Sequence, residues 1–123
     1  MYPTDLKYTI EHEWVRVSGD DATVGITDFA QKQLGDVVFV ELPDVGRTFT
    51  KGEAFGTIES VKAVSELFCP VAGEVLAVNE DLGPRPEQVN SQPHEAWMIR
   101  IRVANSGELD SLLDSAAYDA LTR

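Results

Sequence analysis

The fold of this chain is decided by the stretch Phe55-Gly56-Thr57-Ile58-Glu59-Ser60-Val61-Lys62-Ala63-Val64-Ser65-Glu66-Leu67-Phe68. Two strand-like runs meet there and leave almost no residues for a loop, which predicts a tight β-hairpin. Lys62 lies where the chain must reverse, inside a core hairpin that we place at residues 53–69. An exposed lysine at a turn usually serves solubility alone, so its role depends on further observations.

The tip of this hairpin lacks the usual turn residues. Tight hairpins favour Asn-Gly, Asp-Gly or Gly because primed turns need positive φ, yet Ser60-Val61-Lys62-Ala63 contains no glycine, asparagine or proline. A type I turn tolerates these residues but fits the strand twist less well. Either the tip residues serve a purpose other than turning, or the strands are longer and reverse elsewhere.

Further strand patterns extend on both sides of the hairpin. Together they make about seven or eight short strands at intervals of roughly ten residues, which is typical of a small antiparallel sandwich or flattened barrel. In the last of them we expect Trp97 and Ile99 on one face, and Met98 and Arg100 on the other. The predicted strands span residues 9–17, 22–26, 36–42, 53–60, 64–69, 72–79 and 97–103.

Short helices are predicted at three places. Thr27 and Asp28 supply an N-cap and an acidic first turn for a helix near residue 30, and Gly35 supplies its stop. A turn of helix is expected near residues 86–90. Ser106 caps a C-terminal helical segment whose leucines recur at spacings of three and four, and a second short segment, residues 116–121, is expected to be offset from it near Asp114 and Ser115. Together, residues 106–121 should form a clasp over one sheet edge.

Composition excludes several classes of protein. A chain of 123 residues with 43% hydrophobic residues predicts one globular domain over residues 1–123. The net charge of −11 disfavours nucleic acid and anionic lipid as partners; it suits either solubility or docking onto basic protein surfaces. The absence of a membrane-length apolar run or signal-like N-terminus, with the single Cys69, predicts a cytoplasmic protein with no membrane partner. We expect it to be a monomer.

Lysine chemistry suggests a use for the tip. The four-carbon stem of Lys62 adds reach, and its amine can be acylated by a carboxylic cofactor, which removes the charge. A modifying enzyme would then have to recognise the folded tip as well as the residue itself.

The chain resembles a known family, the H protein of the glycine cleavage system. Its lipoylation motif matches Glu59-Ser60-Val61-Lys62-Ala63, and a second distinctive segment matches Gly25-Ile26-Thr27-Asp28. The connection 93–97 departs from the family pattern, since it is shorter and lacks glycine. The resembling segments are residues 12–15, 24–31, 34–43, 51–53, 59–63, 70–75, 89–93, 97–99 and 112–114.

This resemblance implies a non-enzymatic carrier with the lipoyl/biotinyl-like barrel-sandwich hybrid fold. Lipoate would be held by an amide to Lys62, attached by a lipoate ligase or a lipoyl/octanoyl transferase that recognises Glu59, Ser60, Val61 and Ala63. The implied partners are a PLP-dependent glycine decarboxylase, which loads the aminomethyl group of glycine, and a tetrahydrofolate-dependent aminomethyltransferase, which removes it. A dihydrolipoamide dehydrogenase would reoxidise the arm by thiol–disulfide chemistry.

A loaded aminomethyl arm loses its cargo in water, so the protein should shelter it. An acidic group in a cleft would hold the ammonium end, and Glu13 and Asp28 are the candidates because both precede the carrier strands in family-like segments. The alternative for Glu13 is a plain surface residue at a strand start.

Other residues and other functions are also compatible with parts of the sequence. His12 and His94 make no metal-ligand set with one cysteine and are expected in surface or capping roles, and Cys69 is expected to be a packed thiol. No metal site and no catalytic site is predicted. The alternative functions are a lipoyl domain of another complex, a biotin carrier, an H-like lipoate-relay or regulatory carrier, and an interaction module with an unmodified lysine.

Overall fold

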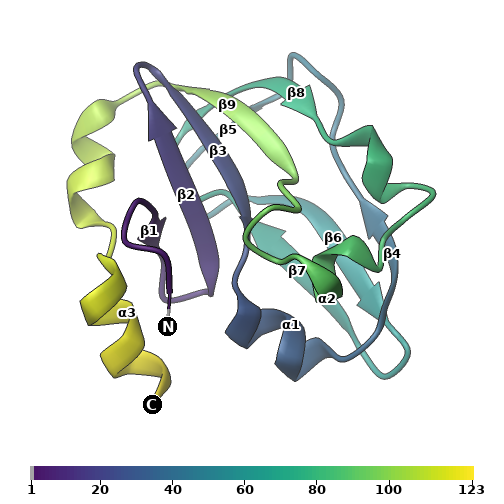
Figure 1. Ribbon diagram of the computed structural model, residues 1–123. Helices are drawn as coiled ribbons and strands as arrows, with labels where there is room; N and C mark the ends of the chain where they lie inside the picture. The colour runs from purple at the N-terminus through teal and green to yellow at the C-terminus, as the bar shows by residue number, and fades with distance from the viewer. Residues whose placement is uncertain (1) are drawn as a thin grey trace.

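The computed structural model describes residues 2–123, which form two antiparallel sheets with short helices at their ends (Figure 1). The larger sheet has the order β1-β2-β3-β9-β8-β5, and the smaller has the order β4-β6-β7. The all-β prediction with short helices is confirmed. The strands are β1 (Lys7–Tyr8), β2 (Glu13–Ser18), β3 (Asp21–Ile26), β4 (Val37–Glu41), β5 (Thr48–Phe49), β6 (Ala54–Ser60), β7 (Val64–Phe68), β8 (Gly73–Val78) and β9 (Ile99–Val103).

The core lies between the two sheets. Side chains that point inward from both sheets, such as Val24, Ile58 and Ile101, belong to one buried cluster. A second cluster forms where the N-terminal segment meets the C-terminal helix, around Tyr8 and Trp14. Burial of this apolar area is the main source of stability in such a fold.

The β2–β3 hairpin depends on one glycine. Trp14 pairs with Gly25 across the two strands, and a Cβ at Gly25 would lie 2.5 Å from the Trp14 ring. The ring therefore occupies the space that any other side chain would need. Its Nε1–H donates to the carbonyl of Pro93 at 2.9 Å, which ties the glycine-free 93–97 connection to this hairpin.

The helix α1 (Asp28–Leu34) begins and ends as predicted. The Thr27 hydroxyl accepts from the backbone N–H of Ala30, and Gly35 ends the helix with a φ of 82°. Asn90, in α2 (Gln88–Ser91), donates to the Gly35 carbonyl at 2.8 Å and accepts from Val37 N–H at 2.8 Å. The long connection before β9, which begins with the 3₁₀ helix η1 (Glu80–Leu82), thus holds the exit of α1 in place.

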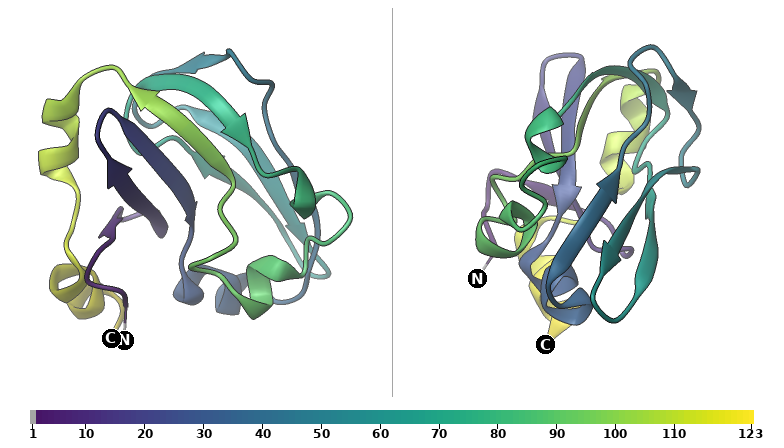
Figure 2. Two further views of the ribbon diagram at one scale, coloured as in Figure 1. Left: turned by 45° about the horizontal axis from the view of Figure 1, so that its top comes forward. Right: turned by 90° about the vertical axis from the view of Figure 1, so that its right-hand side faces the viewer.

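The C-terminal segment has two helical parts, and the expected break near Asp114 and Ser115 is confirmed, but the first part differs from the prediction. Asn105, rather than Ser106, caps a 3₁₀ helix, η2 (Ser106–Ser111). The chain is then extended, so that Leu113 bridges to Tyr8 before α3 (Ser115–Thr122) begins. The leucine spacing predicts α-helix here, but the backbone N–H and C=O of Leu113 are satisfied by hydrogen bonds to Tyr8 of β1 instead. Figure 2 shows this segment covering the β1 edge of the larger sheet.

The predicted orientation of Met98 at the start of the last strand is also wrong. Met98 was assigned to the face of Arg100, but it is fully buried. The strand begins only at Ile99, so the alternation does not extend back to Met98. Among residues 2–123, the structure contains no helix long and apolar enough to cross a membrane.

Candidate functional site

The reversal between β6 and β7 lies at the predicted tip. β6 ends at Ser60 and β7 begins at Val64, so the alternative of a reversal elsewhere is wrong. Neither Val61 nor Lys62 has a positive φ, since His12 alone does among the described non-glycine residues. The tip is therefore built without a primed turn.

The Ser60 side chain explains how this turn forms. Its hydroxyl oxygen accepts from the N–H groups of Lys62 at 3.3 Å and Ala63 at 3.1 Å, while its backbone N–H donates to the Ala63 carbonyl at 2.8 Å. Serine hydroxyls commonly satisfy turn amides in this way. Ser60 thus has a structural role, and it is buried rather than presented at the surface.

The tip is also held by contacts with the connection between α1 and β4. Val61 N–H donates to the carbonyl of Asp36 at 3.1 Å, which joins the hairpin to the connection between α1 and β4. The Lys62 stem runs beside Gly35, because a Cβ on that glycine would lie 3.4 Å from Lys62 Cε. Lys62 is exposed, yet its stem lies against the end of α1.

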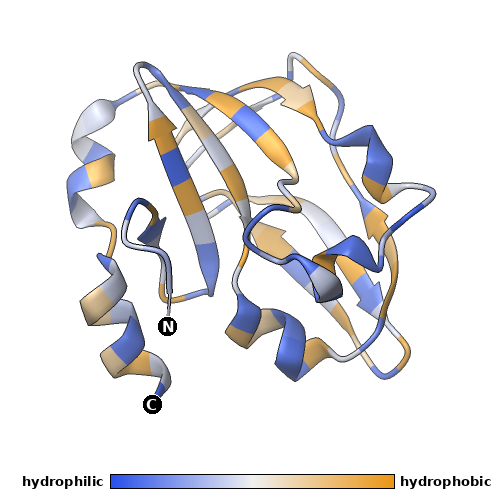
Figure 3. Cartoon of the chain, in the orientation of Figure 1, coloured by the Kyte–Doolittle hydropathy of each residue, from blue (hydrophilic) through white to orange (hydrophobic). Residues whose placement is uncertain are grey.

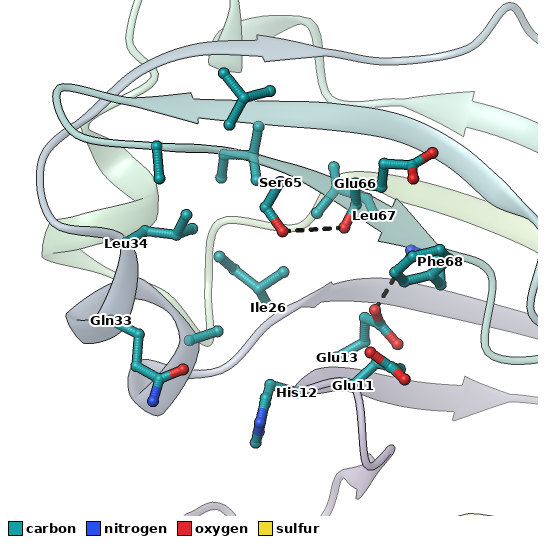
Figure 4. A pocket seen from close by; sticks show the side chains of 14 residues that line it. Glu11, His12, Glu13, Ile26, Gln33, Leu34, Ser65, Glu66, Leu67 and Phe68 are labelled. Carbon is teal, nitrogen blue, oxygen red and sulfur yellow. Dashed lines mark hydrogen bonds between the residues drawn. The ribbon is translucent and has the colours of Figure 1, made fainter.

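A cleft opens next to this lysine. It has a volume of about 370 Å³ and separates β7 from α1 and from the start of β2 (Figure 4). In Figure 4 the labelled side chains of Ile26, Leu34 and Ser65 surround the cleft, and Glu13 lies near Phe68. The lining residues are Glu11, His12, Glu13, Ile26, Ala30, Gln33, Leu34, Ile58, Ala63, Val64, Ser65, Glu66, Leu67 and Phe68.

Glu13 is the buried carboxyl group of this cleft, with only 3% of its surface exposed. Thr9 Oγ1 donates to its Oε1 at 2.7 Å, and Phe68 N–H donates to its Oε2 at 3.4 Å. Burial raises the pKa of Glu13 to about 7, although both hydrogen bonds oppose the shift. A cation placed beside it would favour its charged form.

The wall opposite Glu13 is an unpaired strand edge. β7 is the last strand of the smaller sheet, and Phe68 N–H points from it into the cleft. Because N–H groups of alternate residues in a strand point the same way, those of Glu66 and Val64 face the same edge. The cleft therefore offers hydrogen-bond donors along one wall and a carboxyl group at its end.

Asp28, the other acidic candidate, lies outside this cleft. It lines a different depression with Tyr2, His94 and Asp119, and it pairs with Lys32 at 2.9 Å. The hydrogen bond from Lys32 lowers the pKa of Asp28. Its sequence position suggested proximity to the carrier strand, but α1 turns its first residue away from the cleft.

Four further acidic or polar residues that the sequence did not predict line the cleft: Glu11, Gln33, Ser65 and Glu66. Ser65 and Glu66 line the cleft from β7. Their place just after the hairpin tip was the only available signal, and a strand pattern alone does not reveal which edge remains unpaired.

The remaining candidates have structural roles. His94 Nε2 accepts from Asp28 N–H at 3.3 Å at the start of α1, which confirms a capping role. Cys69 is buried, and burial raises the pKa of its thiol to about 12, as expected for a packed cysteine. Within residues 2–123, no three His, Cys, Asp or Glu side chains are grouped to hold a metal ion.

Comparison with known proteins identifies the family. Residues 6–123 match the family described as "Glycine cleavage H-protein".

The chain belongs to the glycine cleavage H-protein family.

This H-protein family is the lipoyl carrier of the glycine cleavage system, so partner enzymes of that system are implied. The chain is 57% identical over 122 residues to the glycine cleavage system H protein of Symbiobacterium thermophilum, covering 98% of this chain and 95% of that one. It is also 57% identical over 118 residues to the H protein of Koribacter versatilis, covering 96% and 91%.

A solved H-protein structure has the same fold. The crystal structure of the glycine cleavage system H protein from Mycobacterium marinum superimposes with a TM-score of 0.88, at 36% identity and with 97% of each chain covered. The lipoyl-type sandwich predicted from the resemblance is thereby confirmed.

Proposed function

We propose that Lys62 carries lipoate through an amide and that the whole chain, residues 1–123, acts as one cytoplasmic shuttle of the glycine cleavage system. The observation that carries this proposal is the position of Lys62. It is exposed on a braced hairpin tip with its stem beside Gly35, and the next residue, Ala63, lines the cleft that contains Glu13. When bound, lipoate would supply the disulfide that accepts the aminomethyl group of glycine. The arm would later give up this group to the tetrahydrofolate-dependent aminomethyltransferase.

The residues around Lys62 divide into two groups in this proposal. Ser60 holds the turn through its hydroxyl, while Glu59, Val61 and Ala63 are exposed and would be read by a lipoate ligase or a lipoyl/octanoyl transferase. The partners that then visit the arm are the PLP-dependent decarboxylase, the aminomethyltransferase and the dihydrolipoamide dehydrogenase, with the carrier as a monomer.

The cleft supports the shelter that an amine cargo requires. Glu13 would ionise beside the ammonium end of the cargo, because an opposite charge favours the carboxylate. The unpaired N–H groups of Glu66 and Val64 would hydrogen-bond the arm along β7, and Ile26 and Leu34 would exclude water from it. The buried carboxyl group of Glu13 favours glycine cleavage over a lipoate relay, since a relay carries no amine that needs a counter-ion.

The modification is tested by the mass of the intact protein purified from its native host. We expect one lipoyl adduct on the wild type, its loss in Lys62→Arg, and its retention in the control Lys51→Arg, which alters another exposed lysine. Unmodified native protein would contradict the proposal.

The glycine role is tested separately by glycine-dependent bicarbonate exchange with the decarboxylase. Lipoylated wild-type protein should support exchange, and Lys62→Arg should not. A lipoylated protein that supports no exchange would instead indicate the lipoate-relay carrier.

A further inference from the structure

Large apolar side chains are exposed around the hairpin tip. Val61 and Val64 are 71% and 69% exposed, and Val38 and Phe39 on the neighbouring strand are 48% and 51% exposed. We call these four residues the apolar tip patch. Figure 3 shows apolar colouring along β4 and around the turn between β6 and β7.

A β-bulge brings the β4 residues into the patch. Regular alternation would turn only one of Val38 and Phe39 outward. The β4–β6 register shifts between Val37 and Phe39, so both Val38 and Phe39 are exposed while Val37 and Val40 stay buried. Bulges re-aim side chains in this way and recur near functional sites.

The pairing register places the patch on one surface. Phe39 pairs with Glu59, and Glu59 pairs with Val64, so the three side chains form one row across the outer face of the smaller sheet. Directly paired residues share a face, with neighbouring strands about 5 Å apart. This row lies next to the tip that presents Lys62.

The charges around the patch are mostly negative. Glu41 pairs with Thr57, which pairs with Glu66, so a second row on the same face carries two exposed carboxylates. Exposed Asp36 lies at the start of β4, beside the tip. Besides Lys62, the cation Arg47 lines a depression together with Glu41 and Glu66, so the negative groups Asp36, Glu41, Glu59 and Glu66 outnumber the cations around the patch.

We infer that the apolar tip patch is the docking site of the enzyme that acylates Lys62, and that this enzyme offers an apolar recess edged by Lys and Arg side chains. This inference rests on the proposed function. In the acylation the Lys62 amine, after losing a proton, attacks an activated acyl donor; an amide forms and the activating group leaves with the bonding electrons.

The unmodified lysine is short, which explains why the acylating enzyme needs the patch more than the other partners do. Before acylation only the lysine stem separates the amine from the sheet, so the acylating site must close over the tip and its neighbours. After acylation the longer arm can enter other active sites without such close contact. Exposed apolar side chains with an acidic rim are suited to this closure.

The patch is tested by acylation of the apo-protein with a lipoate ligase supplied with lipoate and ATP. In the double variant Phe39→Ser/Val64→Ser we expect the KM for the carrier to rise about 10-fold with little change in kcat, because docking area is lost while the lysine remains. The control Val45→Ser removes a valine that is 61% exposed in the β4–β5 connection and should behave as wild type.

Two variants of opposite charge at Phe39 test whether Lys and Arg side chains edge the recess of the enzyme. Phe39→Glu and Phe39→Lys both remove the ring, but the lysine variant should raise KM several-fold more, because it would face cationic side chains. Thermal unfolding of every variant should match the wild type, since the changed side chains are exposed.

The outcomes separate the two proposals. Equal KM values for wild type, Phe39→Ser/Val64→Ser and Val45→Ser would overturn the docking site alone. If the wild type accepts no acyl group from the ligase, and the native protein carries none, both proposals are overturned.

Discussion

Glu13 is a carboxyl group held where water cannot easily reach it, and its protonation should affect stability. Burial raises its pKa from 4.5 to about 7, so the folded protein holds a proton that the unfolded chain has already released. The unfolding free energy should therefore fall as the pH rises from about 4.5 to about 7, by up to about 3 kcal/mol from this group. Above that range the buried charge remains a cost until a cation pairs with it.

Replacing the Glu13 carboxyl group should remove its contribution to the pH dependence of the unfolding free energy. In Glu13→Gln we expect the pH slope of the unfolding free energy between about pH 5 and 7 to be less negative than in the wild type. Burial lowers the pKa of nearby His12, which acts in the opposite direction, so the comparison is made as a difference between variants. Denaturant unfolding at several pH values measures it, with Glu59→Gln at the exposed tip as control; equal slopes for wild type and Glu13→Gln would refute it.

The contribution of Ser60 to the hairpin turn can be tested by removing its hydroxyl group. Its hydroxyl serves two amides of the turn, and Ser60→Ala should lower the unfolding free energy by about 1 kcal/mol. Amide exchange of Lys62 and Ala63 should quicken as the tip loosens, and lipoylation of Lys62 should slow. Ser65→Ala, on the adjacent strand, is the control, and unchanged amide exchange in Ser60→Ala would show that the backbone alone forms the turn.

At the scale of elements, α3 is linked through the side chain of Tyr118 to His12, which lines the cleft. The Tyr118 hydroxyl lies 2.8 Å from His12 Nδ1 and 2.7 Å from Thr27 Oγ1, and its ring stacks on Tyr8. His12 has a φ of 69°, a conformation that costs a non-glycine residue about 1–3 kcal/mol unless its surroundings hold it. The C-terminal clasp therefore positions the residue that precedes Glu13.

Removing one hydroxyl tests this link. Tyr118→Phe should lower the unfolding free energy by about 1–3 kcal/mol, because Thr27 and His12 lose a buried partner. Hydrogen exchange should increase at residues 11–14 and at the start of α1. Tyr2→Phe is the matched control, since its hydroxyl contacts only the terminal helix at Thr122 in the described structure; equal exchange in both variants would contradict a positioning role for α3.

At the scale of the whole molecule, the net charge of −11 creates a field that attracts basic partners over a distance set by salt. We expect kcat/KM for acylation of Lys62 to fall about 5–10-fold as NaCl rises from about 0.05 to about 0.5 M, because screening slows association. The double variant Glu41→Gln/Glu66→Gln should show a weaker salt dependence. A rate independent of salt would assign the acidic surface to solubility alone.

Local signals in the sequence determined the carrier hairpin, the limits of α1 and the exposure of Lys62. These features depend on residues close together in the chain, such as the Thr27 cap and the Gly35 stop, so their physical causes are visible in the sequence. The tertiary structure decided that Glu13, and not Asp28, lines the cleft beside the hairpin. Glu13 meets Phe68 across 55 residues of chain, Asp28 turns away, and a register shift exposes Phe39 beside the tip. Such features arise from strand pairing and long-range packing, in which each residue's position depends on distant partners, and no local pattern encodes those partners.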